Sequence, residues 1–348
     1  MRRLKAAIYV LTVLALLALP GAAAQAAGWR GNGAPLAEVA SGKFRGDVFI
    51  AGGHGYTKEN PYDETYDLPD GLVRFARLYI PVWDYDPGDE LEPVLNGKSL
   101  GNLQGMPSYL AGFGVSLYTL DVTQQVKMNA RNTLEVRSVN PNGGPYGAYL
   151  VVAYENPDLN VMQFWLTEGD LALSPQSQAQ SQTVFDAFSS GNDTGRLIDP
   201  GMVAKSTLHA LIIGGDGHGT DSLSFNGHQL GVDIAQGKSG PYLDYDHFDV
   251  TGLLSPQLNT ALLDRGDLKY LHPMIDLLVI NYSAESAAEV GDFLSINRSV
   301  TQHDLIQAQR TGLNRYIGQV PTSVLVVLVL LVFIVAISWA KIRRRETL

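Results

Sequence analysis

Apolar and polar side chains alternate along several short stretches of the chain, as they do in a β-strand with two distinct faces. The clearest example runs from residue 75 to residue 83, where aliphatic positions alternate with larger side chains. The aliphatic set is Ala76, Leu78, Ile80 and Val82, and the other set includes Phe75, Arg77, Tyr79 and Trp83. With 36 glycines and 17 prolines separating such stretches, the pattern predicts an all-β protein.

Two continuous apolar runs, Tyr149–Tyr154 and Leu277–Tyr282, indicate strands buried between two sheets. The stretch Met162–Leu166 alternates like a further strand, and it is too hydrophobic for a free linker. We therefore expect antiparallel β-sandwiches that dock against each other.

A set of short motifs occurs twice in the same order, the second copy about 130 residues after the first. The motifs are Asn-Gly-x-x-Leu-Gly at Asn96 and Asn226, Asp-Val-Thr at Asp121 and Asp249, and Asn-Thr at Asn132 and Asn259. This agreement predicts two tandem jelly-roll-like sandwiches. We place the first domain at residues 27–160 and the second at residues 161–285.

Both ends of the chain are hydrophobic. Arg2, Arg3 and Lys5 precede the apolar run Ala6–Leu19, which predicts a secretory signal peptide at residues 1–26. The run Val320–Ala340 is long enough to span a membrane and precedes a basic tail, residues 341–348. We therefore expect a single-pass type I membrane protein with an extracytoplasmic ectodomain. Residues 286–319 are expected to form a partly helical stalk.

Composition narrows the possible partners. The chain carries 25 Lys and Arg against 35 Asp and Glu, a formal net charge of −10, which argues against nucleic acid as a partner. The absence of cysteine in a predicted exported protein fits a prokaryotic surface protein. Asn192 and Asn297 lie in potential glycosylation sequons.

The repeated motifs resemble jelly-roll sandwiches of the galactose-binding-like type. Four longer stretches are similar to a family of methanogenic archaeal surface proteins of unknown function (domain of unknown function 3344). They are residues 76–83, 146–154, 163–169 and 264–273. The resemblance implies an extracytoplasmic location and an archaeal origin, and it brings no established activity and no catalytic residues.

The loop after residue 83 gathers four carboxylates: Asp84, Asp86, Asp89 and Glu90. Oxygen ligands at this density are suited to Ca²⁺, although the spacing is not that of an EF-hand loop. The alternatives are a calcium site and a solvated acidic turn.

Tyr79 and Trp83 share one face of their predicted strand, and an aromatic face can stack against a sugar ring. The alternative is that this face packs in a core or against the neighbouring domain. A concave groove beside Tyr79 or Trp83 would favour sugar binding.

The sequence contains no recognised enzyme motif. Asp244 and Asp246, two positions apart on a predicted strand, would serve a glycosidase only if they met another acid in a cleft. The first hypothesis is a non-enzymatic surface protein that acts in envelope architecture or adhesion, with envelope glycans or surface proteins as partners. The second is a carbohydrate-binding module, with calcium as a conceivable cofactor, and the third is a glycan hydrolase.

Overall fold

The computed structural model describes residues 31–84, 90–104, 107–112, 114–139, 143–187, 197–215, 217–283 and 293–296. Antiparallel strands make up most of this part of the chain. Two short 3-10 helices accompany them, η2 (Pro200–Met202) and η3 (Thr251–Leu253). The predicted all-β class is confirmed.

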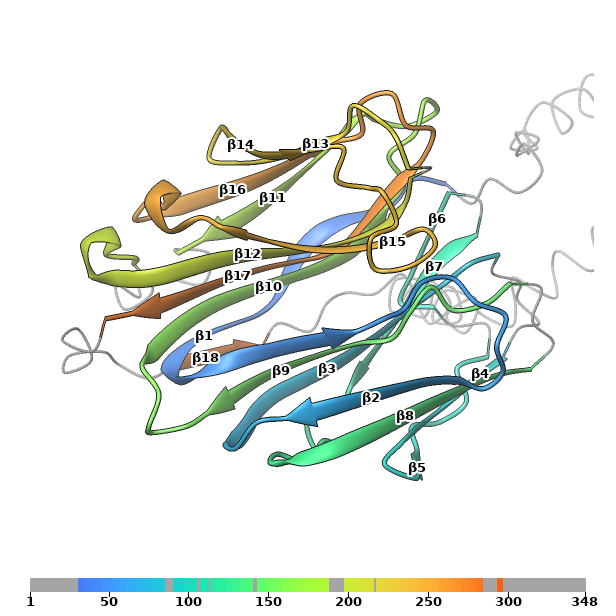
Figure 1. Cartoon of the computed structure of the whole chain (residues 1–348), viewed down its shortest axis with the longest axis horizontal. Helices are drawn as coiled ribbons and strands as arrows, with labels where there is room; N and C mark the ends of the chain where they lie inside the picture. The colour runs from blue at the N-terminus through green and yellow to red at the C-terminus, as the bar shows by residue number, and fades with distance from the viewer. Residues whose placement is uncertain are drawn as a thin grey trace, which may run out of the picture. The chain divides into compact units, whose positions relative to one another are not determined.

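The first half of the chain forms two sheets packed on each other (Figure 1). Its strands are β2 (Tyr62–Leu68), β3 (Leu72–Val82), β4 (Glu90–Leu95), β5 (Lys98–Ser99), β6 (Tyr109–Ala111), β7 (Val115–Asp121), β8 (Ala130–Val139) and β9 (Tyr149–Glu155). One sheet has the order β2-β8-β4-β5, and we call it the first outer sheet. The other, with the order β9-β3-β7-β6, is the first inner sheet.

The second half repeats this arrangement. Its strands are β10 (Val161–Leu171), β11 (Gln180–Asp186), β12 (Val203–Gly214), β13 (Ser222–Phe225), β14 (His228–Val232), β15 (Leu243–Asp249), β16 (Leu258–Asp264) and β17 (Leu271–Tyr282). The second outer sheet has the order β11-β16-β13-β14, and the second inner sheet has the order β10-β17-β12-β15. The two outer sheets correspond strand by strand, and in the inner sheets β9-β3-β7 corresponds to β17-β12-β15.

One long strand, β1 (Gly33–Gly52), joins the two inner sheets. Residues 33–45 pair with β10, and residues 46–52 pair with β9. Gly46 lies where the partner changes; it has a φ of +155°, and a Cβ there would collide with the carbonyl oxygen of Tyr154. The start of the first predicted domain thus pairs with the second half of the chain, which the sequence pattern did not indicate.

The strands bury three hydrophobic cores. Each half has its own core between its outer and inner sheets. The third, which we call the shared core, lies between the two inner sheets and takes side chains from both halves. It includes Phe75, Tyr79, Tyr149, Leu211, Leu243 and Leu277. Both faces of each inner sheet are therefore covered, in keeping with the continuous apolar runs of β9 and β17.

The repeated motifs hold equivalent turns. Asn96 donates from Nδ2 to Oδ1 of the buried Asn132 at 2.7 Å, and Asn226 donates in the same way to Asn259 at 2.8 Å. In the Asp-Val-Thr motifs, the threonine hydroxyl accepts from the backbone of the neighbouring inner strand, as Thr123 does from Ala76 N at 3.0 Å. These residues satisfy buried backbone groups, so the repeat reports a shared fold.

Several predicted segments lie outside the described residues: the signal peptide (1–26), the transmembrane helix (320–340), the tail (341–348) and most of the stalk (286–319). The described part of the stalk is β18 (Phe293–Ile296), which pairs with Ala40–Lys43 of β1. These four residues form a strand within the segment expected to be partly helical, because the free edge of β1 offers them a backbone partner. Among the described residues, no helix has the length and apolar character needed to cross a membrane.

Candidate functional site

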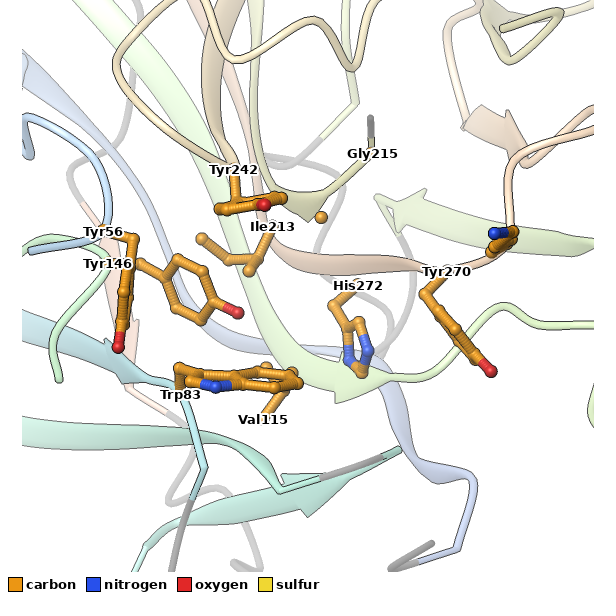
Figure 2. A pocket seen from close by; sticks show the side chains of 11 residues that line it. Tyr56, Trp83, Val115, Tyr146, Ile213, Gly215, Tyr242, Tyr270 and His272 are labelled. Atoms are coloured by element: carbon orange, nitrogen blue, oxygen red, sulfur yellow. The ribbon is translucent and has the colours of Figure 1, made fainter. Parts of the chain in front are cut away.

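A cavity of about 430 Å³ opens at one end of the shared core, with walls from both halves of the chain. Its size falls in the range of small-molecule sites, about 300–1,000 Å³. The lining residues are Tyr56, Trp83, Val115, Tyr146, Ile213, Gly214, Gly215, Tyr242, Lys269, Tyr270 and His272. Five aromatic rings and one imidazole therefore surround a single space (Figure 2).

Strand ends bring these side chains together. Trp83 follows β3 and Val115 begins β7, while Gly214 ends β12. Tyr242 precedes β15, and His272 is the second residue of β17. Because neighbouring strands run antiparallel, the end of one lies beside the start of the next, so all these residues reach the same end of the two inner sheets.

Loops from the two halves are tied to each other beside the cavity. The backbone N–H of Tyr56 donates to the carbonyl oxygen of Pro241 at 2.9 Å, next to Tyr242. Within the first half, the N–H of Trp83 donates to the carbonyl oxygen of Gly144 at 2.9 Å. The rings of Tyr56 and Tyr146 lie 5.7 Å apart, at an angle of 55°. The aromatic walls are thus fixed by backbone contacts and ring packing.

Figure 2 shows Trp83 and Tyr242 on opposite sides of the cavity, with Tyr56 and Tyr146 at one end and His272 and Tyr270 at the other. Burial, reinforced by the charge of Asp84, raises the pKa of Tyr56. Burial also raises the pKa of Tyr146 well above its ordinary value. Both hydroxyls therefore stay protonated and can act as hydrogen-bond donors.

A buried carboxylate supports the histidine. Asp170 of β10 is fully buried, and its Oδ1 lies 2.8 Å from Nδ1 of His272, which is 3% exposed. Burial raises the pKa of Asp170, and the hydrogen bond and charge of His272 partly oppose this shift. A carboxylate in this position fixes the orientation of the imidazole ring.

The two predicted sugar-stacking residues have different environments. Trp83 lines the cavity and is 36% exposed. Tyr79, four residues earlier on the same strand face, is 0% exposed and packs in the shared core. It therefore cannot stack against a sugar in this structure, because the second inner sheet covers it.

The predicted calcium ligands are only partly described. Asp84 follows Trp83 with a φ of 59°, and Glu90 begins β4, where it accepts a hydrogen bond from Asn102 at 2.9 Å. Asp86 and Asp89 lie outside the described residues, as do the sequon residues Asn192 and Asn297. Among the residues that the structure describes, no three His, Asp or Glu side chains are grouped as metal ligands.

Asp244 and Asp246 are not in the cavity lining. The two oxygens of Asp244, which is 0% exposed, accept from the backbone N–H groups of Gly237 and Lys238 at 2.8 and 2.9 Å. Asp246 lies 3.6 Å from the Lys238 ammonium. These carboxylates stabilise the loop that leads to Tyr242 through contacts with Gly237 and Lys238. They therefore affect the cavity only by positioning this loop.

Most of the lining was not identified from the sequence, because its residues lie in turns far apart along the chain. One signal was present: Trp83, Tyr146, Lys269, Tyr270 and His272 all fall in the stretches that carry the family resemblance. Those stretches extend past the strands into the turns at this end of the sheets. Tyr56 and Tyr242 had no comparable signal.

The fold and the cavity define an antiparallel β-sandwich protein with an aromatic pocket between two similar halves. The chain belongs to the family described as "Protein of unknown function (DUF3344)", whose model matches residues 28–281. No curated protein matches the chain.

Solved structures show only distant similarity. The major capsid protein P2 from Bacteriophage PM2 is 10% identical, with a TM-score of 0.22, over 69% of this chain and 99% of its own. N-glycanase F is 12% identical, with a TM-score of 0.23, over 72% of this chain and 100% of its own. Streptomyces avermitilis alpha-L-rhamnosidase complexed with L-rhamnose is 14% identical, with a TM-score of 0.19, over 78% of this chain and 29% of its own. Similarities at this level establish no function.

Proposed function

We propose that the protein binds a saccharide in the aromatic pocket and does so outside the cell, held at the membrane by its C-terminal segment. The observation that carries the proposal is the concave site in which Trp83 and Tyr242 face each other across a cavity of about 430 Å³. Sugar rings present apolar C–H faces that pack on aromatic rings, and their hydroxyls need donors and acceptors nearby. The protonated tyrosine hydroxyls, Lys269 and His272 supply these groups.

A binding role fits this pocket better than glycoside hydrolysis. Hydrolysis commonly uses two carboxylates that flank the scissile bond. Among the described lining residues there is no Asp or Glu, and Asp244 is hydrogen-bonded to backbone elsewhere. An envelope or adhesion role follows naturally, because a surface protein that binds envelope glycans attaches to them.

An aromatic box of this kind can also hold a quaternary ammonium ion through cation–π contacts. Lys269 in the lining opposes that ligand, because a cation would meet a positive charge in the same space. A saccharide meets no such repulsion.

The test is a glycan array followed by calorimetry on the purified full-length protein. We expect Trp83→Ala and Tyr242→Ala each to weaken binding by at least about fivefold, since lost ring contacts are worth roughly 1 kcal/mol or more. Tyr79→Phe is the matched control, because Tyr79 is an aromatic residue of the same strand face that the pocket does not include.

Choline serves as the probe for the quaternary ammonium alternative. Binding of choline without any glycan would overturn the saccharide proposal. Glycan binding that survives both alanine substitutions in folded protein would place the site elsewhere.

A further inference from the structure

The pocket is electrostatically unlike the rest of the protein. The whole chain has a formal net charge of −10, yet the ionisable side chains in the described lining, apart from tyrosines, are Lys269 and His272. Lys269 is exposed at the turn before β17. A positive group in a concave site on an acidic protein is a local attraction for an anion.

Both basic residues line the cavity, and Lys269 is three residues before His272 in the chain. Figure 2 shows Tyr270 and His272 together, away from Tyr56 and Tyr146. The charge of Asp84 is felt at the Tyr56 end of the cavity, where it adds to the effect of burial in raising the pKa of Tyr56. The site therefore differs along its length: a carboxylate lies near the Tyr56 end, whereas the lining at the other end includes His272, with Lys269 three residues earlier in the chain.

His272 is held so that one ring nitrogen is left for a ligand. Asp170 engages Nδ1 at 2.8 Å, and Nε2 has no partner among the described hydrogen bonds. Gly112 lies beside this edge of the ring: a Cβ on Gly112 would come within 3.1 Å of Nε2 and 2.9 Å of Cε1. The absence of a side chain at Gly112 keeps the Nε2 edge of the imidazole uncovered from that side.

Burial of Asp170 is unfavourable for the fold, and its contact with His272 offsets this cost only in part. A buried carboxylate loses its hydration, and within the described residues its Oδ2 has no hydrogen-bond donor. Asp170, whose own pKa is raised by burial, contacts an imidazole that lines a cleft, and groups with shifted pKa values in clefts are common at functional sites.

We propose that the pocket is specific for acidic saccharides: a uronate-type sugar binds with its ring between Trp83 and Tyr242 and its carboxylate at Lys269. The carboxylate also accepts from Nε2–H of His272 when the imidazole carries both protons. Asp170 is a positioning residue in this arrangement, because it acts through His272. The carboxylate then avoids Asp84, which gives the sugar one preferred direction in the cavity. This inference depends on the proposed function, since it names the class of saccharide that the same pocket takes.

The test compares two oligosaccharides that differ only at one terminal sugar, glucuronate in one and glucose in the other. We expect the wild-type protein to bind the glucuronate form at least about tenfold more tightly, and the difference to shrink as salt is added. Lys269→Gln should bring the two affinities within about threefold, because it weakens binding of the glucuronate form more than binding of the glucose form. Lys98→Gln removes one exposed positive charge from β5 of the first outer sheet, and it should leave the preference intact.

His272→Gln should also reduce the preference, with thermal unfolding used to confirm that the variant is folded. Because Lys269 is exposed, Lys269→Gln provides the decisive comparison if His272→Gln does not fold. Equal binding of the two oligosaccharides by the wild-type protein would overturn the acidic-sugar inference and leave saccharide binding in place. Binding of neither one, with no other glycan bound on the array, would overturn both.

Discussion

Oδ1 of Asp170 lies 2.8 Å from Nδ1 of His272, so a fully buried carboxylate on β10 holds an imidazole on β17 that lines the pocket. The two residues are 102 positions apart in the sequence. They meet because β10 and β17 are neighbours in the second inner sheet.

This pair gives the first prediction. Asp170→Asn should reduce the preference for glucuronate over glucose, because the amide can present an N–H to His272 and turn or release the ring. Stability should also fall, by about 1–3 kcal/mol, since a buried hydrogen bond is altered. The change in preference, measured by calorimetry, separates positioning from packing, because a purely structural role would weaken both sugars equally. The ¹⁵N chemical shifts of the His272 imidazole would report which ring nitrogens carry protons and hydrogen bonds. Unchanged chemical shifts together with an unchanged sugar preference would contradict the positioning role.

His209 gives a prediction on acid stability. Burial is the main cause that lowers its pKa from 6.5 to about 4, with smaller contributions from His247 and Lys205, and its Nδ1 lies 2.8 Å from the Tyr245 hydroxyl. Between pH 6.5 and 4 the unfolded chain takes up a proton that the folded protein refuses, so stability falls as the pH falls. The loss reaches up to about 3 kcal/mol near pH 4. His209→Gln should flatten this slope in urea unfolding, whereas the same change at the exposed His228 should not.

Asp276 gives the opposite slope. Burial raises its pKa from 3.8 to about 6, and the Thr183 hydroxyl donates to it at 2.6 Å. The folded protein keeps this proton after the unfolded chain has lost it, so stability falls as the pH rises from 4 to 6 and stays lower above. Asp276→Asn should stabilise the protein at pH 7 by about 1–3 kcal/mol, with less gain at pH 4. An equal effect at both pH values would show that the carboxyl has an ordinary pKa in the folded state.

The opposing slopes of His209 and Asp276 should largely cancel in the wild-type protein between pH 4 and 6. The double variant should therefore show a pH profile close to that of the wild type in this range, although each single variant departs from it. Asp276 is adjacent to Leu277, which pairs with His209 across β12 and β17, so any departure of the double variant from the sum of the single effects measures the coupling between the two groups.

The buried asparagines of the repeat give a prediction about the fold. Oδ1 of Asn259 accepts from Asn226 and from Ser255 N, both at 2.8 Å, and its Nδ2 donates to Ser255 O at 2.9 Å. Asn259→Ala leaves these groups buried and unpaired, so it should cost about 2–4 kcal/mol in chemical denaturation. Asn132→Ala, in the equivalent place, should have a similar cost. Neither should change sugar affinity in folded protein, and a loss of binding there would mean that the turns act on the pocket.

Much of the fold was determined locally. Alternation along residues 75–83 predicted a two-faced strand, and β3 covers Leu72–Val82. The repeated asparagines and Asp-Val-Thr motifs marked equivalent turns, because the same hydrogen bonds are required wherever the same turn is built. Long-range pairing was not determined in this way: β1 changes partner at Gly46, and β18 adds to β1, since edge pairing depends on which backbone groups are free.

The sequence by itself determined which residues share a strand face, and only the tertiary structure decided what covers that face. Tyr79 and Trp83 have the same parity on one strand, yet Tyr79 is enclosed by the second inner sheet and Trp83 stands where the two inner sheets end. The pocket likewise depends on turns from both halves that meet only after the sheets pack. Side-chain alternation is a local consequence of backbone geometry, whereas exposure and the meeting of distant residues such as Asp170 and His272 depend on contacts between strands far apart in the chain.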